Sequence, residues 1–415
     1  MSHPGLCTTI HTCRISDSSD VEVFLDLGDQ PLANQLIESP DVDEETYPLR
    51  LGFSSTSGLV QLMETVPKEK LFRNYVWVSG TASTTREYAE IFFQRALQAL
   101  QALGLQPGQA SIVEIASNDG TFLNPFHQRG IKVLGVDPAQ NLAAEATARG
   151  IGTWPEFWDT KIAARIRQTR GAADFVFARN VVPHVSELHE VIQGMHDVLA
   201  DNGLGIIEFH EAGRIVEEMH YDSIYHEHLC YFSLHAMEYL LRRHALHPYH
   251  IEFSPISGGS IVVQFTKSPR KPSPEYTAQI DREKKLGLTE LATWKRFSER
   301  CGEHRAQTLA LLSQFDSKRI VGFGASARSS TFLNYCNITP GHMRTVIDNN
   351  PRKQGLFTPG SHLPIVSFEE GLALDPAAIF LLAWNFADEV IAQCRQRGFK
   401  GAFIQPFPNQ PKIIH

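Results

Sequence analysis

The feature that most constrains the fold of this chain is an alternation of short apolar runs with helical stretches between residues 111 and 208. The apolar runs are Ser111–Ile115, Lys132–Val136, Phe175–Ala178 and Leu204–Glu208. Strands that alternate with helices pair in parallel, and their crossover helices cover both faces of the sheet. The pattern therefore predicts an α/β domain built on a doubly wound, Rossmann-like sheet.

The length of 415 residues is too great for one ordinary core and predicts about two to three domains. Turn formers and strand-like runs in residues 1–75 predict a small β-rich domain, and residues 76–285 hold the first α/β domain. Residues 286–318 predict a linker, because the pattern from Gly287 to Lys318 is that of one long amphipathic helix. Residues 319–415 repeat the α/β pattern and predict a second Rossmann-like domain.

Charge and composition limit the partners and the compartment. A formal net charge of −8 argues against nucleic acid and membrane surfaces as partners. The chain has neither a run of ~18 apolar residues nor a signal-peptide pattern at its start, so we expect a cytoplasmic protein. Its 6 cysteines form no C-x-x-C pair, which predicts neither a disulfide framework nor an intact zinc site.

The first candidate site is the turn that follows the strand Ser111–Ile115. A strand that ends in small residues lets the backbone approach a nucleoside, and an acid at the end of the next strand accepts both ribose hydroxyls. Because no G-x-G-x-x-G is present, S-adenosylmethionine fits this turn better than a dinucleotide, although a purely structural corner stays open. We expect Glu114 to face the amino-acid end of the donor. The predicted donor-binding residues are Glu114, Ala116, Asn118, Asp119, Gly120, Asp137 and Pro138.

A further pair of candidates follows the strand Phe175–Ala178. Ligands of open α/β sheets lie beyond the carboxyl ends of the strands, so Asn180 and His184 are expected at the cleft. Asn180 is suited to hold the backbone of the donor. His184 is either a catalytic residue or a histidine that only satisfies the start of a helix, and both interpretations stay open.

The run Tyr225-His-Glu-His228 follows the strand Leu204–Glu208 and combines three useful side chains. Histidine suits proton abstraction near neutral pH, and the carboxylate of Glu227 can fix its tautomer. The hydroxyl of Tyr225 can donate to a developing enolate. A metal site is disfavoured because adjacent residues rarely converge on one ion. A solvent-facing helix with chance polar residues is the remaining alternative.

The run Gly322-Phe-Gly-Ala-Ser-Ala-Arg328 joins a strand to a helix in the second α/β unit. Such a turn presents backbone N–H groups to phosphate, and Arg328 is a candidate counter-ion. A lone G-x-G is weak evidence, so a structural corner is equally compatible with the pattern.

These motifs together resemble the sugar C-methyltransferases that act on nucleotide-linked 4-keto deoxysugars, such as those of the mycarose type. The likeness runs from about Cys13 to Pro406. The motifs that carry it are Leu25–Gly28, Pro31–Asn34, Leu59–Leu62, Val113–Gly120, Tyr225–His228, Ser257–Ser260, Gly322–Ala325 and Leu382–Asn385. Several motifs in the same order are specific, whereas any one of them is not.

The resemblance implies a small N-terminal zinc-binding module, a central methyltransferase domain and a C-terminal Rossmann-like domain. It implies that His228 is the general base, assisted by Glu227 and Tyr225, and that Tyr75 also reaches the active site. Trp77 stands where relatives often have a second tyrosine. The residues expected around the substrate are Gly258, Gly259, Gly324, Ala325, Arg328 and Asn385.

Two departures from the family pattern stand out. The four zinc-ligand positions read Cys13, Ser16, Ser54 and Ser57. Serine hydroxyls are poor zinc ligands at neutral pH, so we expect zinc to be absent and the module to be held by packing alone. Ser257 also replaces a histidine that often precedes the two glycines.

The sequence thus predicts an S-adenosylmethionine-dependent C-methyltransferase that removes the proton at C3 of a nucleotide-linked 4-keto sugar and methylates that carbon. We expect a monomer with this sugar as its partner. An O- or N-methyltransferase of another small molecule and a non-catalytic binding relative are the alternatives. A nicotinamide-dependent oxidoreductase that uses the turn at Gly322 is disfavoured, because no full glycine fingerprint with a suitably spaced acid is present.

Overall fold

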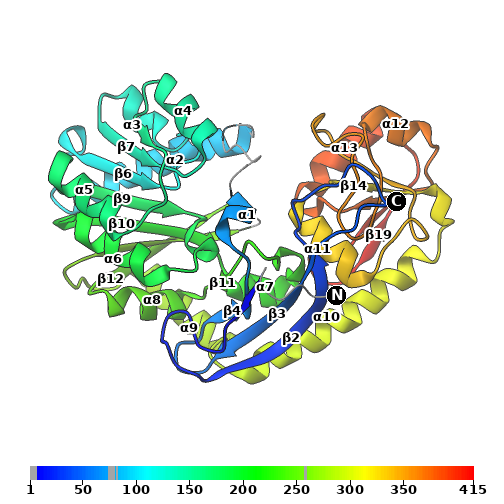
Figure 1. The fold of residues 1–415 in the computed structure, drawn as a ribbon, viewed down its shortest axis with the longest axis horizontal. Helices are drawn as coiled ribbons and strands as arrows, with labels where there is room; N and C mark the ends of the chain where they lie inside the picture. Colours follow the sequence, from blue (N-terminus) through cyan, green and yellow to red (C-terminus); the bar gives the residue numbers. More distant parts are fainter. Residues whose placement is uncertain (1–6, 73–79, 81–82, 257–258) are drawn as a thin grey trace.

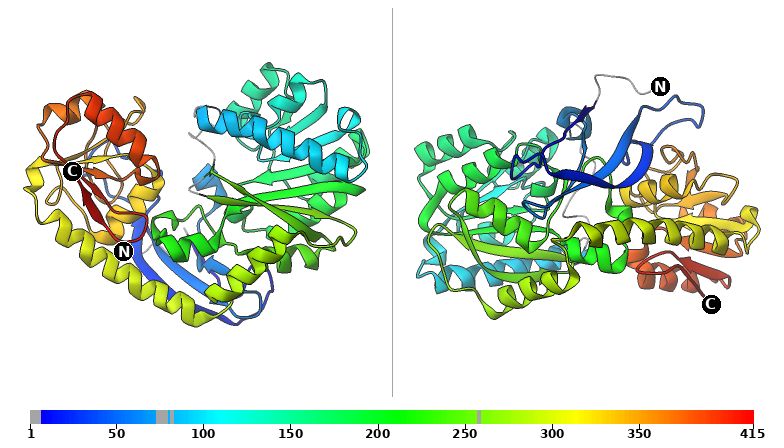
Figure 2. Two further views of the ribbon diagram at one scale, coloured as in Figure 1. Left: turned by 180° about the vertical axis from the view of Figure 1, so that it is seen from behind. Right: turned by 90° about the horizontal axis from the view of Figure 1, so that it is seen from below.

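The computed structural model describes residues 7–72, 80, 83–256 and 259–415 (Figure 1). Two lobes stand side by side, one around a seven-stranded sheet and the other around a six-stranded sheet. The strands β2 (Val21–Pro31) and β3 (Thr46–Ser54) and the helix α10 (Leu291–Leu312) run from one lobe to the other along their base (Figures 1 and 2). None of the helices in the described part of the chain is long and apolar enough to cross a membrane.

The first lobe contains the sheet predicted from the alternating pattern. Its strands are β6 (Ser111–Ile115), β7 (Lys132–Val136), β8 (Thr153–Trp154), β9 (Ala173–Arg179), β10 (Leu199–His210), β12 (His247–Ser254) and β13 (Ser260–Thr266). They lie in the order β12-β13-β10-β9-β6-β7-β8. The strands from β6 to β10 are parallel, whereas β13 and β12 are antiparallel at one edge. The predicted doubly wound α/β fold is confirmed.

Helices cover both faces of this sheet because successive side chains of a strand point to opposite sides. Ile112 and Phe175 enter a core with α2 and α3, where the ring of Phe92 stacks on Phe175 at 6.3 Å. Val113 and Val176 enter the other core, with α5 and α6. The helices are α2 (Ser83–Ala102), α3 (Asn124–Gln128), α4 (Gln140–Ala148), α5 (Thr160–Arg170), α6 (Leu188–Val198) and α8 (Leu234–Arg243).

The second lobe repeats this plan on a smaller scale. Its strands are β14 (Ile320–Phe323), β15 (Thr345–Ile347), β16 (Ile365–Val366), β17 (Ala378–Leu381), β18 (Ala402–Gln405) and β19 (Lys412–Ile414). Only β19 runs antiparallel to its neighbour among the strands that the structure describes here. The covering helices are α11 (Ala327–Cys336), α12 (Phe368–Ala373) and α13 (Ala387–Gln396). The predicted second Rossmann-like unit is therefore present.

The N-terminal sheet takes one strand from far along the chain. It has the order β11-β4-β3-β2, in which β4 is Val60–Leu62 and β11 is Cys230–Tyr231. Cys230 pairs with Gln61, and Tyr231 pairs with Val60. The smaller elements of this region are β1 (Thr8–Thr9), β5 (Glu64–Thr65) and α1 (Lys68–Phe72). The segment after His228 is thereby built into the N-terminal sheet.

The single helix predicted from Gly287 to Lys318 is wrong at both ends. Gly287 has φ +68° and caps the preceding helix α9 (Pro274–Leu286), so α10 begins only at Leu291. It ends at Leu312, and Asp316 then caps a 3₁₀ turn by accepting from the backbone N–H of Lys318. A glycine in the left-handed conformation ends a helix instead of starting one.

Candidate active site

A cavity of ≈ 520 Å³ opens at the carboxyl ends of β6, β7 and β9. The predicted site residues that line it are Ala116, Asn118, Asp137, Pro138, Asn180 and His184. Open α/β sheets bind ligands at this edge, where the strand order reverses around the first strand. The structure therefore brings most of the predicted donor-binding residues and His184 to one cavity.

Asp137 forms the polar corner of this cavity. Its Oδ2 accepts from the backbone N–H of Asn118 at 2.7 Å, and its Oδ1 accepts from that of Ala139 at 2.8 Å. The side chain is buried, and this burial raises its pKa although the two N–H groups oppose the shift. A carboxylate oxygen can accept more than one hydrogen bond, so each oxygen keeps capacity for a ribose hydroxyl.

Backbone strain gathers at the same cavity. Ala116, Asn118 and Asn180 have φ values of 54°, 52° and 50°. Residues other than glycine seldom adopt this left-handed conformation, and such residues cluster at ligand sites. The strained turns bring the backbone of two neighbouring strand ends to the edge of the cavity, as the binding of a nucleoside requires.

Three further residues predicted to bind the donor are not among the residues that line the cavity. Glu114 is buried on β6, its Oε2 has no hydrogen-bond partner within the described residues, and burial raises its pKa well above the usual range. Asp119 accepts from the hydroxyl of Thr121 at 2.7 Å and shapes the turn. Gly120, with φ +77°, packs against Ile151. Their roles toward the donor stay predictions.

The structure adds lining residues that the sequence did not single out. Phe157 and Trp158 lie in the loop after β8 and line the cavity together with Lys68. The indole N–H of Trp158 donates to the carbonyl of Val191 at 3.1 Å, which fixes its ring, while Phe157 is exposed and lies 4.7 Å from Nζ of Lys68. Aromatic faces of this kind suit a flat base. The aromatic run Trp154-Pro-Glu-Phe-Trp158 was the signal for them.

His228 has a defined tautomer. Its Nδ1 lies 2.7 Å from the carbonyl oxygen of Ser223, which can only accept, so Nδ1 carries the hydrogen. Its Nε2 lies 2.8 Å from the hydroxyl of Tyr225 and accepts from it. Burial, together with the nearby His184 and Arg328, holds the pKa of His228 well below its usual range. The ring is therefore neutral near pH 7, and its basic nitrogen is Nε2.

His184 connects this histidine with the cavity. It ends the 3₁₀ turn η3 (Val182–His184), and its ring lies 4.6 Å from the ring of His228 in an edge-on arrangement. Burial lowers the pKa of His184 to about 4. Since His184 also lines the cavity, the cavity and His228 are neighbours, as expected for a donor and a base.

Glu227 does not hold His228 in the way that we predicted. Its Oε1 accepts from Nδ2 of Asn34 at 2.6 Å, while the ring nitrogens of His228 bond to Ser223 and Tyr225. The chain turns here, with the N–H of His228 donating to the carbonyl of Tyr225 at 2.9 Å, and the carboxylate of Glu227 meets the segment that follows β2 instead. Burial raises the pKa of Glu227 to about 7, although the hydrogen bond from Asn34 opposes the shift.

The second lobe contains an aspartate, Asp348, that accepts two backbone hydrogen bonds as Asp137 does. Asp348 follows β15, its Oδ2 accepts from the N–H of Ala325 at 2.9 Å, and its Oδ1 accepts from that of Asn350 at 2.8 Å. Gly324 has φ +103° and packs against Ala383 at the end of β17. Asp348 was not among the predicted site residues, although its position 24 residues after Gly324 is a signal that could have identified it.

The remaining residues predicted to bind the substrate differ in their contacts and exposure. Arg328 is bound to Asp222 by two hydrogen bonds, of 2.9 and 2.8 Å, so its predicted role as a free phosphate counter-ion does not fit this geometry. Asn385 is exposed in the turn η7 (Trp384–Phe386). Gly259 has φ +112° and faces the guanidinium of Arg214. Tyr75, Trp77, Ser257 and Gly258 lie outside the described residues.

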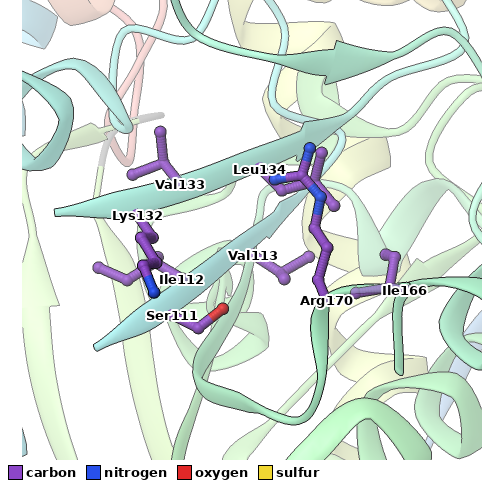
Figure 3. Close-up of a pocket in the computed structure, with 8 residues that line it drawn as sticks. All are labelled: Ser111, Ile112, Val113, Lys132, Val133, Leu134, Ile166 and Arg170. Atoms are coloured by element: carbon purple, nitrogen blue, oxygen red, sulfur yellow. The ribbon is translucent and has the colours of Figure 1, made fainter. Parts of the chain in front are cut away.

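A second cavity, of ≈ 370 Å³, lies at the opposite edge of the same sheet (Figure 3). It begins at Ser111 and Lys132, the first residues of β6 and β7, and is bordered by Arg170 at the end of α5. No residue of the predicted site lines it. Its place at the amino ends of the strands, with both cations exposed, does not favour a ligand site.

The chain matches three domain families in succession. Residues 13–72 match a family described as "Putative zinc binding domain". Residues 86–250 match "Methyltransferase domain", and residues 255–408 match "C-methyltransferase C-terminal domain". These matches follow the order of the N-terminal sheet, the first lobe and the second lobe.

Individual proteins are also similar to this chain. The C-methyltransferase NovU of Streptomyces niveus is 31% identical over 414 residues, which cover 98% of this chain and 97% of NovU. Among solved structures, magnesium protoporphyrin IX methyltransferase (ChlM) of Synechocystis PCC 6803 with bound SAM has 14% identity and a TM-score of 0.34, over 48% of this chain and 89% of ChlM. An S-adenosylmethionine-dependent methyltransferase of Mesorhizobium loti has 16% identity and a TM-score of 0.32, over 40% of this chain and 95% of that protein.

The residues at the zinc positions do not fit a zinc ion. Sγ of Cys13 lies 3.1 Å from Oγ of Ser57, which donates to Oγ of Ser54 at 3.2 Å. Ser54 in turn donates to Asp20 at 2.9 Å, and Ser16 bonds to Ser18. No group of three or more His, Cys, Asp or Glu side chains suited to a metal occurs in the described ranges. One thiol and three hydroxyls already bonded to protein make a poor zinc donor set.

Proposed function

The chain belongs to the C-methyltransferase family, which makes it an S-adenosylmethionine-dependent enzyme, and we propose that its acceptor is C3 of a nucleotide-linked 4-keto deoxysugar. The observation that carries the proposal is the neutral His228, whose basic nitrogen is Nε2 and whose ring lies 4.6 Å from the ring of His184, a residue that lines the cavity. A carbon acceptor needs a base before it can react, and a proton next to a ketone is one that a neutral imidazole can remove.

Bound in the cavity, S-adenosylmethionine supplies an electrophilic methyl group. Asp137 would bind the ribose of the donor, and Asn118 and Asn180 would bind its other polar groups. Glu114 would bind its amino group. Phe157 and Trp158 would flank the adenine. The buried, unpartnered Oε2 of Glu114 supports this fit, because an unpaired acceptor at such depth is costly without a donor to bond.

His228 would take the C3 proton onto Nε2, and the pair of electrons left on the sugar would form the new bond to the methyl carbon. The bond from that carbon to the donor sulfur would break at the same time, and its electrons would stay on the sulfur of the demethylated donor. Tyr225 now donates to Nε2, so its hydroxyl must turn away as the proton arrives. We propose that it turns to the oxygen of the C4 ketone and stabilises the enolate. Ser223 keeps its hydrogen bond to Nδ1 and stabilises the imidazolium that forms.

The second lobe would bind the nucleotide. The turn at Gly324 and Ala325 and the exposed Asn385 stand at the carboxyl ends of β14 and β17, where such a ligand belongs. We further propose the domain limits 1–75, 76–285, 286–318 and 319–415. A single chain carries both the cavity and the base, which supports a monomer as the working unit.

Deuterium exchange tests this function. With a panel of nucleotide-linked 4-keto deoxysugars in deuterated water, and with the demethylated product of the donor bound, the protein should exchange the C3 hydrogen without methyl transfer. His228→Ala should lose exchange and turnover together, by ~10²–10⁴-fold, whereas Tyr225→Phe should keep part of both. His196→Ala, a histidine of α6 paired with Asp197, is the control and should match the wild type.

Exchange at the wild-type rate in His228→Ala would move the base elsewhere, with His184 the next candidate. Methylation at oxygen or nitrogen of the sugar, with no exchange at carbon, would identify an O- or N-methyltransferase. Donor binding without turnover on any member of the panel would favour a non-catalytic relative.

A further inference from the structure

The segment from His220 to Tyr231, called here the base segment, is held by both lobes and by the N-terminal sheet. Its end is β11, which pairs with β4. Its beginning contacts the second lobe, where the fully buried ring of Tyr221 lies 6.0 Å from the ring of Phe332 on α11. The hydroxyl of Tyr221 also bonds to Nδ1 of His304 on α10 at 2.9 Å. The base itself, His228, lies between these two anchors.

Asp222 joins the base segment to the second lobe by three hydrogen bonds. Its carboxylate accepts from Nε of Arg328 at 2.9 Å, from Nη2 of Arg328 at 2.8 Å and from the indole N–H of Trp384 at 2.7 Å. The guanidinium of Arg328 also lies 4.8 Å from the ring of Trp384. A carboxylate with two bonds from one arginine and a third from an indole has a single available orientation.

The Asp222–Arg328 pair is shielded from water. The side chain of Asp222 is 2% exposed and that of Arg328 is 17% exposed. Breaking a buried pair of this kind leaves an uncompensated charge, so the two lobes cannot separate here without a large penalty. The Asp222–Arg328 pair therefore fixes the position of the base segment on the second lobe, which an exposed ion pair does not do.

Asp222 and Ile224 flank Ser223, whose carbonyl oxygen determines the tautomer of His228. Asp222 precedes Ser223, whose carbonyl oxygen accepts from Nδ1 of His228. On the other side, the hydroxyl of Thr331 on α11 donates to the carbonyl of Ile224 at 2.8 Å. The second lobe thus holds the backbone on both sides of Ser223.

We propose that Asp222, held by Arg328 and Trp384, is a positioning residue through which the second lobe fixes the Ser223 carbonyl and thereby the tautomer and orientation of His228. This inference rests on the proposed function, because it takes His228 as the base. It gives Arg328 a structural partner inside the protein in place of the substrate phosphate. The second lobe then has a part in proton abstraction as well as in nucleotide binding.

The test reads the tautomer of His228 directly. In full-length protein with ¹⁵N-labelled histidine, two-bond ¹H–¹⁵N spectra distinguish an Nδ1–H ring from an Nε2–H ring, and the loss of one signal set in His228→Gln assigns it among the 18 histidines. Arg328→Lys keeps the charge and loses the paired hydrogen bonds. It should broaden the His228 signals or shift them toward the other tautomer, and lower kcat by about 10–100-fold with unchanged donor affinity.

Two further variants keep the test decisive. Trp384→Phe keeps an aromatic ring beside Arg328 and His220 but removes the indole N–H donor and part of the ring. It should give a smaller change of the same kind, even if Arg328→Lys folds poorly. Arg319→Lys is the matched control, since Arg319 binds Asp375 at 3.0 Å in the same lobe with 50% and 92% of the two side chains exposed. It should leave the His228 signals and kcat at their wild-type values.

Unchanged His228 signals and kcat in both Arg328→Lys and Trp384→Phe would overturn the inference. A raised KM for the sugar nucleotide, with His228 signals unchanged, would also overturn it and make Arg328 a substrate ligand. Failure of the proposed function is a separate result, because exchange that survives in His228→Gln would refute the base while the tautomer could still be read.

Discussion

Asn34 and Glu227 lie 193 residues apart in the chain, yet Nδ2 of Asn34 is 2.6 Å from Oε1 of Glu227. Asn34 follows β2 of the N-terminal sheet, and Glu227 directly precedes His228. Burial of the carboxyl group raises its pKa, and the hydrogen bond from Asn34 opposes this shift. The N-terminal region is thus bonded to the residue that directly precedes His228.

The stability of the protein should reveal the proton on Glu227. Burial raises the pKa of this group to about 7, so the folded chain holds a proton there that the unfolded chain loses at lower pH. Folding therefore becomes less favourable as the pH rises from the ordinary value of a glutamate toward 7. Glu227→Gln should be more stable than the wild type by up to ~3 kcal/mol at about pH 8, and the difference should vanish near pH 4.

Urea unfolding at a series of pH values measures this difference. Glu22→Gln, at an exposed position of β2, is the control and should show no such trend. A stability difference that stays constant across the whole pH range would contradict the prediction.

Asp137→Ala should weaken the binding of S-adenosylmethionine by roughly 1.5–3 kcal/mol, the contribution of hydrogen bonds to a charged group. Titration calorimetry gives the value directly. Asp348→Ala is a matched control, because Asp348 makes the same pair of backbone hydrogen bonds in the second lobe. Equal donor affinity in Asp137→Ala and the wild type would remove Asp137 from the donor site.

The pH dependence of exchange should show a base that stays neutral in mild acid. Burial and the neighbouring His184 lower the pKa of His228, so the lone pair on Nε2 remains available below pH 6.5. In the Glu227→Gln background, which removes the titration of that carboxyl group, the exchange rate should be flat from about pH 7.5 to pH 5.5. A fall with a midpoint near pH 6.5 would show instead that His228 behaves as an exposed histidine.

The N-terminal module should be stable without metal. Asp20 accepts from the hydroxyls of Ser54 at 2.9 Å and Ser55 at 2.8 Å, from the N–H of Thr56 at 2.6 Å and from Ser18. Burial opposes its ionisation, but these hydrogen bonds outweigh burial and lower its pKa. Chelator should leave the melting temperature unchanged, and elemental analysis should find far less than one zinc per chain.

Asp20→Asn should lower the free energy of unfolding by about 1–2 kcal/mol, because it weakens several charged hydrogen bonds at once. Asp29→Asn, at an exposed position of β2, should have little effect. Stoichiometric zinc that a chelator removes with loss of stability would show that the hydroxyls at Ser16, Ser54 and Ser57 do bind metal.

The sequence was sufficient to predict the parallel sheet and the place of Asp137 at the end of β7, because both depend on local patterns. The bounds of β6 and β7 follow from apolar runs of strand length, and Asp137 follows from the spacing of two strand ends. The helix α10 was placed too long because a helical pattern continues through Gly287, whose left-handed conformation ends the preceding helix.

The contacts around His228 could not be predicted in the same way. The pairing of Glu227 with Asn34, and of Arg328 with Asp222, joins residues that are far apart in the chain. Sequence proximity suggested that Glu227 would hold His228, but the backbone carbonyl of Ser223 takes that place. Which of several polar neighbours bonds to a side chain is set by tertiary packing, which a single sequence does not specify.

The addition of β11 to the N-terminal sheet has a consequence for how the active site comes into being. Val60 and Gln61 emerge early in synthesis and must wait for Cys230 and Tyr231, with the entire parallel sheet made in between. Pairings so distant in sequence form late in folding, since the intervening chain must first be ordered. The parallel strands whose ends line the cavity can therefore form while the segment around His228 is still loose. The segment that carries His228 is fixed at this end only when β11 joins β4.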